Sequence, residues 1–327
     1  MKSNRIILIA LALLFSGLAI YLFRPISGLP ESADFHCLDL QDGVFVLLDS
    51  LPPTNTIYGM GLIYRPHLEE TAAEFNPDAI PPIFKKDIQS LARDNDQVRL
   101  PSKRQLTGSL DEFDPESARH LETEYDNVSP LLDYEVELGF MLLEDVQSGE
   151  IEAAGFVPPI GFFIANDLSA RTVALMGEGS HRRYEYWGIS KSFPGFTPTS
   201  DQVWIPDVPT PNSIPCVTIE TYVNGQSRQS QATDQMLYTP AEMLRFIHQK
   251  YPEATFKAGD MVLTGTPGGV AIATPRVLVR LSNLLGFDRY KKLSVKLGGD
   301  LSAFLQAGDT VEVGAEGLGK VTVQIVE

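Results

Sequence analysis

Hydrophobic and polar residues alternate along the stretch LLDYEVELGF, residues 131–140. Successive side chains of a β-strand point to opposite faces, so Asp133, Glu135 and Glu137 are predicted to share one face of a strand. The apolar residues between them share the other face. Two interpretations of the acidic face stay open: it is the solvated side of a half-buried strand, or its carboxylates converge on a bound cation.

The rest of the chain is predicted to consist mainly of strands and turns. Further strands are predicted in DGVFVLLDSLPP, in the apolar run AAGFVPPIGFFIANDLSAR, in VTIETYVNG with an Asn-Gly hairpin turn, and in the tail GDTVEVGAEGLGKVTVQIV. Helices are predicted in RPHLEETAAEF, DPESARHLETEY and TPAEMLRFIHQKY. The last begins with Thr239 and Glu242 spaced as a capping box. No glycine-rich nucleotide-binding motif follows a strand, and there is no P-loop.

The first part of the chain is apolar enough to cross a membrane. Residues 5–23 carry no charge after Arg5 and are long enough for a spanning helix. Lys2 and Arg5 precede the apolar core, which favours a cytoplasmic location for the amino end, residues 1–4. A cleaved signal sequence is the competing interpretation. We therefore expect a single-pass membrane anchor, with the remainder of the chain in the periplasm or another non-cytoplasmic space.

Composition and charge narrow the class of protein. Of the 327 residues, 43% are hydrophobic and 9% aromatic, which is typical of a globular protein with a sizeable core. The formal net charge of −16 argues against binding to nucleic acid, whose phosphates need a basic partner. The two cysteines, Cys37 and Cys216, either pair in an oxidising space or remain two buried thiols, and the sequence leaves both open.

Two groups of residues could carry chemistry. Asp167 stands where an apolar run ends and can add a third carboxylate to Glu135 and Glu137, although a turn cap is the alternative. A cluster of carboxylates without histidine suits Mg²⁺, or Mn²⁺ in its place, better than zinc. His67 and Glu70 are three residues apart in a predicted helix and share a face. Such a pair suits a general base for water, with an isolated surface pair as the alternative.

A series of short motifs resembles the fumarylacetoacetate hydrolase family. From about Ile57 to the carboxyl terminus the chain contains, in order, D-Y-E-V-E-L-G, N-D-L-S-A-R, K-S-F, V-N-G-x-x-x-Q, T-G-T-P-G-G-V and G-D-x-V-E-V-x-x-E-G-L-G. Each motif is weak alone, but the ordered series is specific. The resemblance implies an α+β, mainly β fold, a mixed β-sandwich roll with peripheral helices, here preceded by the transmembrane helix. We expect residues 24–55 to form a linker and N-terminal strand region, and residues 56–327 the catalytic domain.

The resemblance also assigns roles to individual residues and implies a homodimer. It places the metal ligands at Glu135, Glu137 and Asp167, with Mg²⁺ as the cofactor and Mn²⁺ or Ca²⁺ as substitutes. The segment GLIYRPHLEE is similar to the family's G-L-N-Y-x-x-H-x-x-E, which makes His67 and Glu70 a catalytic dyad. Lys191 in SKSF matches a catalytic lysine that faces the substrate. The positions that match substrate-binding residues are Lys86, Arg171 and Thr266.

The chain departs from the family pattern at several positions. Ile63 stands where the family commonly has asparagine, residues 171–174 read RTVA in place of Arg-Asp-x-Gln, and residues 199–200 replace a glycine-proline. These losses of polar groups concern the substrate and leave the metal ligands in place. Three apparent insertions cover residues 102–132, 172–190 and 275–296. The last is basic with an apolar stripe, which is typical of a solvated helix or an oligomer contact, with a lipid-facing segment as the other interpretation.

These features predict a divalent-metal-dependent hydrolase that cleaves a carbon–carbon bond in a 2-oxo or 1,3-dicarbonyl acid of acylpyruvate or fumarylacetoacetate type. His67, oriented by Glu70, is expected to deprotonate the attacking water. Oxaloacetate-type decarboxylation and the hydratase or isomerase reactions of the family stay open as alternatives. So does a catalytically silent relative that binds a metabolite. The expected partners are a small-molecule acid and a second copy of the chain.

Overall fold

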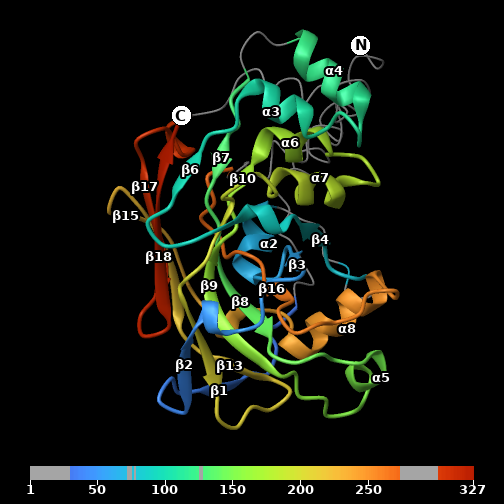
Figure 1. Ribbon diagram of the computed structural model, residues 1–327, viewed down its shortest axis with the longest axis vertical. Helices are drawn as coiled ribbons and strands as arrows, with labels where there is room; N and C mark the ends of the chain where they lie inside the picture. The colour runs from blue at the N-terminus through green and yellow to red at the C-terminus, as the bar shows by residue number, and fades with distance from the viewer. Residues whose placement is uncertain (1–29, 72–75, 77–78, 125–127, 273–300) are drawn as a thin grey trace, which may run out of the picture.

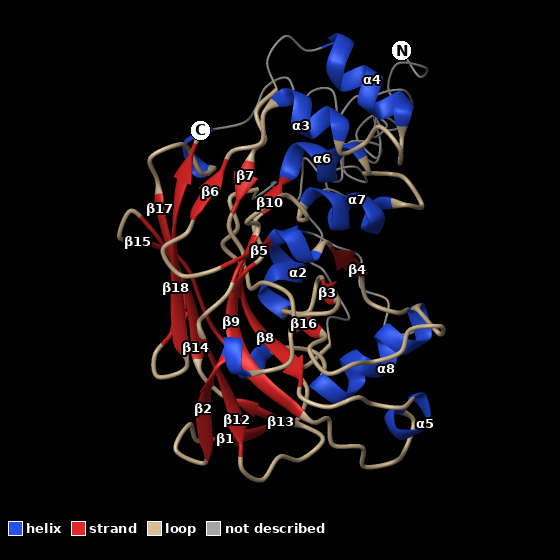
Figure 2. Cartoon of the chain, viewed as in Figure 1, coloured by secondary structure: helices blue, strands red, loops and turns tan. Residues whose placement is uncertain are grey.

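Two large β-sheets form the centre of the protein, and helices cover one side (Figures 1 and 2). The structure is a computed structural model that describes residues 30–327 with gaps at 72–75, 77–78, 125–127 and 273–300. The seven-stranded sheet contains, in spatial order, β2 (Gly43–Leu47), β12 (Gln202–Pro206), β9 (Ile160–Asn166), β8 (Val136–Leu142), β16 (Met261–Leu263), β3 (Ile57–Met60) and β4 (Ile83–Lys86). The five-stranded sheet contains β15 (Gln226–Ala232), β14 (Thr218–Val223), β17 (Thr310–Ala315), β18 (Gly319–Val326) and β6 (Gln97–Arg99). Most neighbouring strands are antiparallel, so the described fold is the expected α+β, mainly β sandwich.

Three short strand pairs accompany the large sheets. They are β1 (His36–Leu38) with β13 (Ser213–Pro215), β7 (Leu132–Asp133) with β10 (Ser169–Ala170), and β5 (Leu91–Ala92) with β11 (Thr197–Pro198). Of the region predicted as linker and N-terminal strand, the described part therefore contains β1 and β2.

The two sheets pack face to face through the apolar sides of their central strands. Strands β8 and β9 contact β14, β17 and β18 across the interface. Phe140 on β8 and Phe162 on β9 belong to the same buried cluster as Val313 and Val323 on the opposite sheet. The apolar face that the alternation of residues 131–140 predicts is therefore the face that fills the sandwich.

Most of the α-helices lie on the side of the seven-stranded sheet away from the five-stranded one (Figure 1). The α-helices are α2 (Arg65–Thr71), α3 (Lys103–Gly108), α4 (Pro115–Glu124), α5 (Ser148–Ile151), α6 (Arg171–Met176), α7 (Arg183–Ser190) and α8 (Pro240–Lys250). The 3-10 helices are η1 (Leu48–Ser50), η2 (Ile88–Ser90), η3 (Thr233–Gln235) and η4 (Leu301–Ala303). Helix α7 packs on β4 at the sheet edge. Lys191, directly after α7, contacts Glu135 next to the start of β8.

Local signals in the sequence predicted two of these elements well. The capping box of α8 is formed, because the Thr239 side chain accepts from the Glu242 backbone amide and the Glu242 carboxylate accepts from the Thr239 amide. The hairpin between β14 and β15 turns at Asn224 and Gly225, both with positive φ, as a tight primed turn requires.

The acidic stretch forms two strands and not the single strand that its alternation predicts. Strand β7 ends at Asp133 and pairs with β10, whereas β8 begins at Val136 and pairs with β9 and β16. Leu131, with φ of 50°, marks an abrupt change of direction before β7. The break follows from two different pairing partners, which the local pattern does not encode.

Two of the three apparent insertions form helices. Residues 102–132 contain α3 and α4, and residues 172–190 contain most of α6 and all of α7. The third, residues 275–296, lies outside the described residues.

The predicted transmembrane helix is corrected. Within residues 30–327, gaps excepted, no helix is long and apolar enough to cross a membrane. The longest described helix, α8, has 11 residues and spans about 16 Å, against about 30 Å for a bilayer core. The predicted segment, residues 5–23, lies outside the described residues. An apolar stretch is necessary for a spanning helix but not sufficient, because cleaved targeting segments share its composition.

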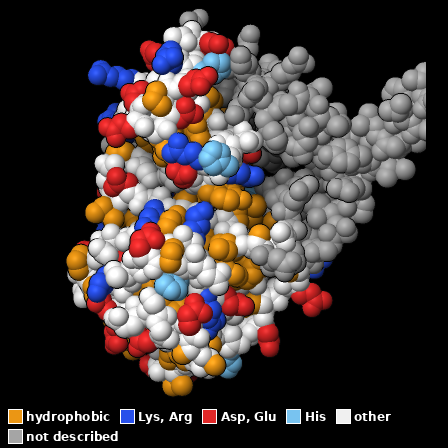
Figure 3. Space-filling view, turned by 90° about the vertical axis from the view of Figure 1, so that its right-hand side faces the viewer, with side chains coloured by type: hydrophobic (Ala, Val, Ile, Leu, Met, Phe, Trp, Pro, Cys, Tyr) orange, Lys and Arg blue, Asp and Glu red, His pale blue; other side chains and the backbone are white. Residues whose placement is uncertain are grey.

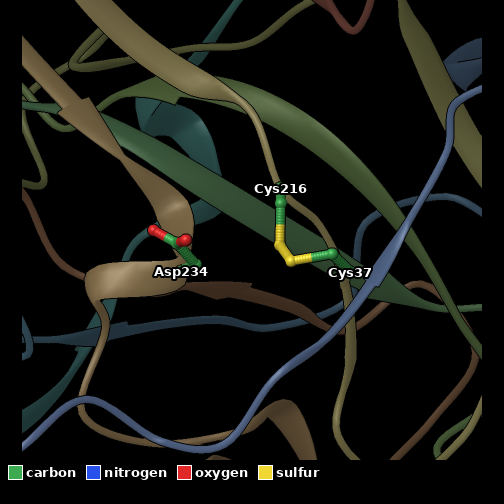
Figure 4. A group of neighbouring side chains, drawn as sticks. All are labelled: Cys37, Cys216 and Asp234. Atoms are coloured by element: carbon green, nitrogen blue, oxygen red, sulfur yellow. A yellow bond between two sulfur atoms is a disulfide. The ribbon is translucent and has the colours of Figure 1, made fainter.

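A disulfide ties the N-terminal strand to the sandwich. Cys37 on β1 is bonded to Cys216, which directly follows β13, and their Cα atoms lie 5.1 Å apart (Figure 4). This decides between the two possibilities that the sequence leaves open. Asp234 lies nearby, but the two sulfurs are bonded to each other, so this trio is not a candidate metal site.

Removing this disulfide is expected to destabilise the domain. The bond joins residues 179 positions apart, and closing so long a loop constrains the unfolded chain strongly. We expect the double variant Cys37→Ser, Cys216→Ser to lose about 2–5 kcal/mol of unfolding free energy in denaturant titrations. Reduced wild-type protein should match the variant, and the variant should not respond to reductant. Identical midpoints for oxidised and reduced wild type would contradict this.

Candidate metal-binding active site

Three carboxylates meet where two neighbouring strands begin and end. Glu135 and Glu137 lie at the start of β8, and Asp167 directly follows β9. Because the two strands are antiparallel, with Val136 opposite Asn166, the start of one lies beside the end of the other. The Asp167 amide donates to the Glu135 carbonyl at 2.8 Å, which holds the end of β9 beside the start of β8. Carboxylate oxygens of the three residues lie within 4.8 Å of one another.

This acidic face is buried. Glu135 is 5% exposed, and Glu137 and Asp167 are each 1% exposed. The solvated-face interpretation is therefore wrong, because side chains from α2 and α7 cover this face. Both elements contribute to the lining of the small cavity above the carboxylates. Alternation along a strand shows which residues share a face but not whether distant helices cover it.

Two lysines neutralise part of the buried negative charge. Lys86 on β4 donates through Nζ to the Asp167 carboxylate and, at 3.1 Å, to the Phe196 carbonyl. Lys191, just after α7, bridges Glu135 and Asp167, with 2.6 Å from its Nζ to Asp167 Oδ2. The two lysine side chains are 0% and 4% exposed. Buried charges at this depth need such partners, so each lysine is held firmly against the carboxylates.

Arg171 is held between Glu135 and a fourth carboxylate, Asp133. Its Nε donates to Asp133 at 2.8 Å, and its Nη2 donates to Glu135. Asp133 is fully buried and also accepts from the amides of Ala271, at 2.7 Å, and Ile272, at 3.2 Å. The sequence placed Asp133 on the acidic face as one of the carboxylates that could converge on a cation, but it did not predict the contact with Arg171. It acts as a positioning residue that holds Arg171 against Glu135.

The two glutamates of the cluster respond differently to their surroundings. Burial alone would raise the pKa of Glu135, but Arg171 and Lys191 outweigh it and lower the pKa to about 2. Burial raises the pKa of Glu137, and the negative charge of Asp167 raises it further. Glu137 therefore holds its proton to a higher pH than an exposed glutamate does, whereas Glu135 stays ionised.

The residues present fit a hard divalent cation. Among the described residues, Glu137 has no ion-pair partner, and its Oε2 accepts from the Gly265 amide at 2.8 Å. A buried carboxylate left without a cation is costly unless it is protonated or a metal binds there. All the converging donors are oxygens, which is the ligand set that Mg²⁺, Mn²⁺ and Ca²⁺ prefer.

Metal binding to this cluster is expected to release a proton. Glu137 must be ionised to bind a cation, and its raised pKa means that the metal-free protein keeps a proton there. Mg²⁺ affinity should therefore rise with pH until Glu137 is ionised. Calorimetric titrations in two buffers of different ionisation enthalpy should report up to one proton released per metal. Identical binding enthalpies in the two buffers would contradict this.

A small cavity lies above the carboxylates. Its volume is about 30 Å³, enough for one or two water molecules. It brings together several predicted site residues that are far apart in sequence. Its lining includes Met60, Gly61, Leu62, His67, Phe84, Glu135, Glu137, Arg171, Trp187, Lys191 and Thr266. Lys86 and Asp167 do not line the cavity. Asp167 is connected to it through its ion pair with Lys191, and Lys86 is bound to Asp167.

Comparison of the chain with known families decides its relationship. The family model described as fumarylacetoacetate (FAA) hydrolase C-terminal matches residues 56–326. The chain belongs to the fumarylacetoacetate hydrolase family. The match covers every strand of both sheets except β2, and every carboxylate of the cluster.

Curated relatives share about a quarter of their residues with this chain. An uncharacterized protein of Archaeoglobus fulgidus is 27% identical over 225 residues, which is 68% of this chain and 72% of the relative. The human protein named oxaloacetate tautomerase FAHD2A, mitochondrial, is 26% identical over 269 residues, or 82% of this chain and 65% of the relative. This relative is named as a mitochondrial protein, which disagrees with the prediction of a membrane-anchored, non-cytoplasmic domain. That prediction is therefore wrong. The prediction rested on the apolar residues 5–23 and on the charges of Lys2 and Arg5.

Solved structures of the fumarylacetoacetate hydrolase family share the fold. The fumarylpyruvate hydrolase from Pseudomonas aeruginosa, solved with Mn²⁺ and pyruvate, has a TM-score of 0.53 at 17% identity, covering 89% of this chain and 99% of that one. The fumarylacetoacetate hydrolase from Exiguobacterium antarcticum has a TM-score of 0.50 at 24% identity, covering 84% and 76%. At these identities the likeness concerns the fold.

The family's catalytic dyad is represented here by one described side chain. His67 on α2 is 8% exposed and lines the cavity with Glu135 and Glu137. Glu70 lies three residues further along the same helix, but its side chain is outside what the structure describes. The dyad therefore remains a prediction, whereas the position of His67 beside the carboxylates is a structural finding.

Gln229 holds the loop that carries Thr266. Its Nε2 donates to Thr266 Oγ1 at 2.9 Å and to the Pro267 carbonyl at 3.1 Å. Its Oε1 accepts from the Val136 amide at 3.1 Å and from the Thr221 hydroxyl at 2.7 Å. Gln229 thus connects β15 and β14 with the start of β8 and with the cavity. The motif V-N-G-x-x-x-Q contained this residue, but the spacing gave no indication of its partners.

Proposed function

We propose that the protein is a divalent-metal-dependent hydrolase that cleaves a carbon–carbon bond in a 2-oxo or 1,3-dicarbonyl acid. The observation that carries the proposal is the cavity itself, which places His67 and Lys191 on the same small space as two carboxylates of the buried triad. A base, a cation and a metal-binding cluster within one cavity are the groups that such a cleavage requires.

Glu135, Glu137 and Asp167 would hold the cation, with Mg²⁺ as the expected metal and Mn²⁺ or Ca²⁺ as substitutes. The family relative from Pseudomonas aeruginosa, solved with Mn²⁺ and pyruvate, supports this assignment. When bound, the metal supplies Lewis-acid polarisation of the substrate's oxygens, worth several kcal/mol of barrier.

The charges of the cluster favour an anionic substrate. Four carboxylates face three cationic side chains, so ionisation of all of them leaves one negative charge in excess. A divalent cation reverses that excess to one positive charge. Lys191 lines the cavity and stands where negative charge would develop on the substrate. Two N–H groups of Arg171 donate to Asp133 and Glu135, so its main effect is to keep Glu135 ionised and in place.

His67 would act as the general base. It would take a proton from the attacking water and return it to the carbon atom that cleavage releases. Glu70, one helical turn away, would orient the imidazole and raise its basicity. Thr266 lines the same cavity and offers its hydroxyl to a substrate oxygen.

Keto–enol tautomerisation of a 2-oxo diacid is the second candidate. It is supported by the human relative, which is named as an oxaloacetate tautomerase. The reaction moves a proton to or from the carbon between two carbonyl groups, so His67 would exchange its proton with that carbon directly. No water needs to be activated. The two candidates therefore use the same base and differ in whether a water reaches the carbonyl.

A substrate panel tests the proposal. Purified protein is assayed with acetylpyruvate, fumarylpyruvate and oxaloacetate, with Mg²⁺ and with excess chelator. Metal-dependent release of pyruvate from an acylpyruvate supports hydrolysis, and loss of the oxaloacetate enol without pyruvate release supports the tautomerase. Absence of both activities would contradict the proposal and favour a silent metabolite-binding protein. Light scattering on the same preparation tests the proposed homodimer.

A further inference from the structure

A second, much larger cavity borders α7 and is lined by other α7 residues than the metal site is. Its volume is about 550 Å³, within the range of ordinary small-molecule sites. It is bounded by β4, α7, the loop after α3 and the end of α8. These elements belong to the side of the molecule that faces the viewer in Figure 3, where hydrophobic side chains cross the middle of the surface with basic side chains among them.

The walls of this cavity are rich in aromatic rings. The aromatic residues in its lining are Phe84, Phe113, Tyr184, Phe193 and Tyr251. Flat rings at several sides favour a flat apolar body between them over a flexible chain.

Two lysines of the cavity have no carboxylate partner. Lys85 lies 4.5 Å from the Tyr251 ring centre, and Lys250 lies 5.5 Å from that of Tyr184. Neither forms an ion pair within the part of the chain that the structure describes. Both side chains are exposed, so their charges are available to a ligand.

The acidic residues of the cavity are already engaged. Asp87 accepts from the backbone amide and the side-chain amide of Gln89, where it caps η2. Glu185 pairs with Arg182 at 3.2 Å. Arg182 offsets the charge of Glu185, whereas amide donors leave the charge of Asp87 in place. Lys85 and Lys250 therefore face one uncompensated carboxylate, and the excess charge in the cavity is positive, which favours an anion.

We propose that this cavity binds a planar organic anion, an aromatic or conjugated carboxylate, at a site distinct from the metal centre. The carboxylate lies between Lys85 and Lys250, and the flat body lies against the rings of Tyr184, Tyr251 and Phe84. This inference does not depend on the reaction proposed above.

The cavity is connected to the metal site through shared elements. Phe84 lines both cavities, and its ring lies 6.3 Å from that of Trp187, which lines only the smaller of the two. Helix α7 contributes Tyr184 to the larger cavity and is followed directly by Lys191, which binds the carboxylate triad. A ligand in the larger cavity therefore contacts the elements that hold Trp187 and Lys191 at the metal site.

Calorimetric titration with 2-naphthoate tests the proposal, with neutral 2-naphthamide as the matched ligand. We expect one site per chain and at least tenfold weaker binding of the amide, because it lacks the charge. Lys85→Met and Lys250→Met should each weaken naphthoate binding about three- to tenfold, whereas Lys85→Arg should retain it. Lys320→Met, on β18 in the five-stranded sheet, is the control and should bind as wild type does.

Competition separates this site from the catalytic one. In the presence of saturating Mg²⁺ and oxalate, the protein should still bind one naphthoate per chain. Displacement of naphthoate by oxalate would place it in the metal site and overturn the proposal. Equal affinity for the amide, or unchanged affinity in the two methionine variants, would overturn it as well. Binding that weakens as the protein concentration rises would assign the cavity to a second copy of the chain, against the proposal.

Discussion

Glu135→Gln is expected to lose Mg²⁺ binding by at least about 100-fold and to lose turnover with it. The substitution removes one of three converging carboxylates and leaves Lys191 and Arg171 facing an uncharged amide. Three cations would then face three carboxylates, so the attraction for a dication falls sharply. Calorimetric titration with Mg²⁺ measures the loss directly.

Breaking two buried ion pairs also threatens folding, so a second variant is needed. Glu137→Gln removes a carboxylate that has no ion-pair partner among the described residues, and it should keep the fold while losing the metal. Glu316→Gln, in the exposed turn between β17 and β18, is the matched control and should behave as wild type. Wild-type Mg²⁺ affinity in folded Glu137→Gln would contradict the assignment of the ligands.

His67→Ala is expected to separate chemistry from metal binding. It should retain Mg²⁺ affinity within about twofold, because no ligand oxygen is lost, and lower kcat by about 10²–10⁴-fold, the usual contribution of a general base. His36→Ala, on the exposed strand β1, is the control. Single-turnover rates on the substrate that the panel identifies measure the effect.

The outcome for His67→Ala decides the mechanism. Wild-type turnover in this variant would remove His67 from the reaction and leave the dyad without a role. Loss of Mg²⁺ binding together with turnover would show that His67 supports the metal site and is not a base.

The strand alternation predicted which acidic residues share a face, and the structure confirms that arrangement for Glu135 and Glu137. It did not predict that the face is buried, because the covering residues His67 and Trp187 come from helices far away in the sequence. For the same reason the role of Asp133 was missed, since it depends on Arg171, 38 residues further along the chain.

Local signals were reliable where the physics is local. The capping box of α8 and the turn at Asn224 depend on residues within a few positions of each other, and both formed as predicted. The pairing of Cys37 with Cys216 depends on β1 lying beside β13, which no local pattern shows. The membrane anchor was predicted from an apolar stretch that follows basic residues, a pattern that spanning helices share with targeting segments.

Anomalous diffraction from crystals grown with Mn²⁺ is the most direct test of the account. A peak is predicted among the carboxylates of Glu135, Glu137 and Asp167, with metal–oxygen distances of about 2–2.5 Å. The same peak should be absent in Glu137→Gln. A map without a peak between these three residues, whether or not Mn²⁺ is bound elsewhere in the crystal, would contradict the claim that the buried triad is a metal site.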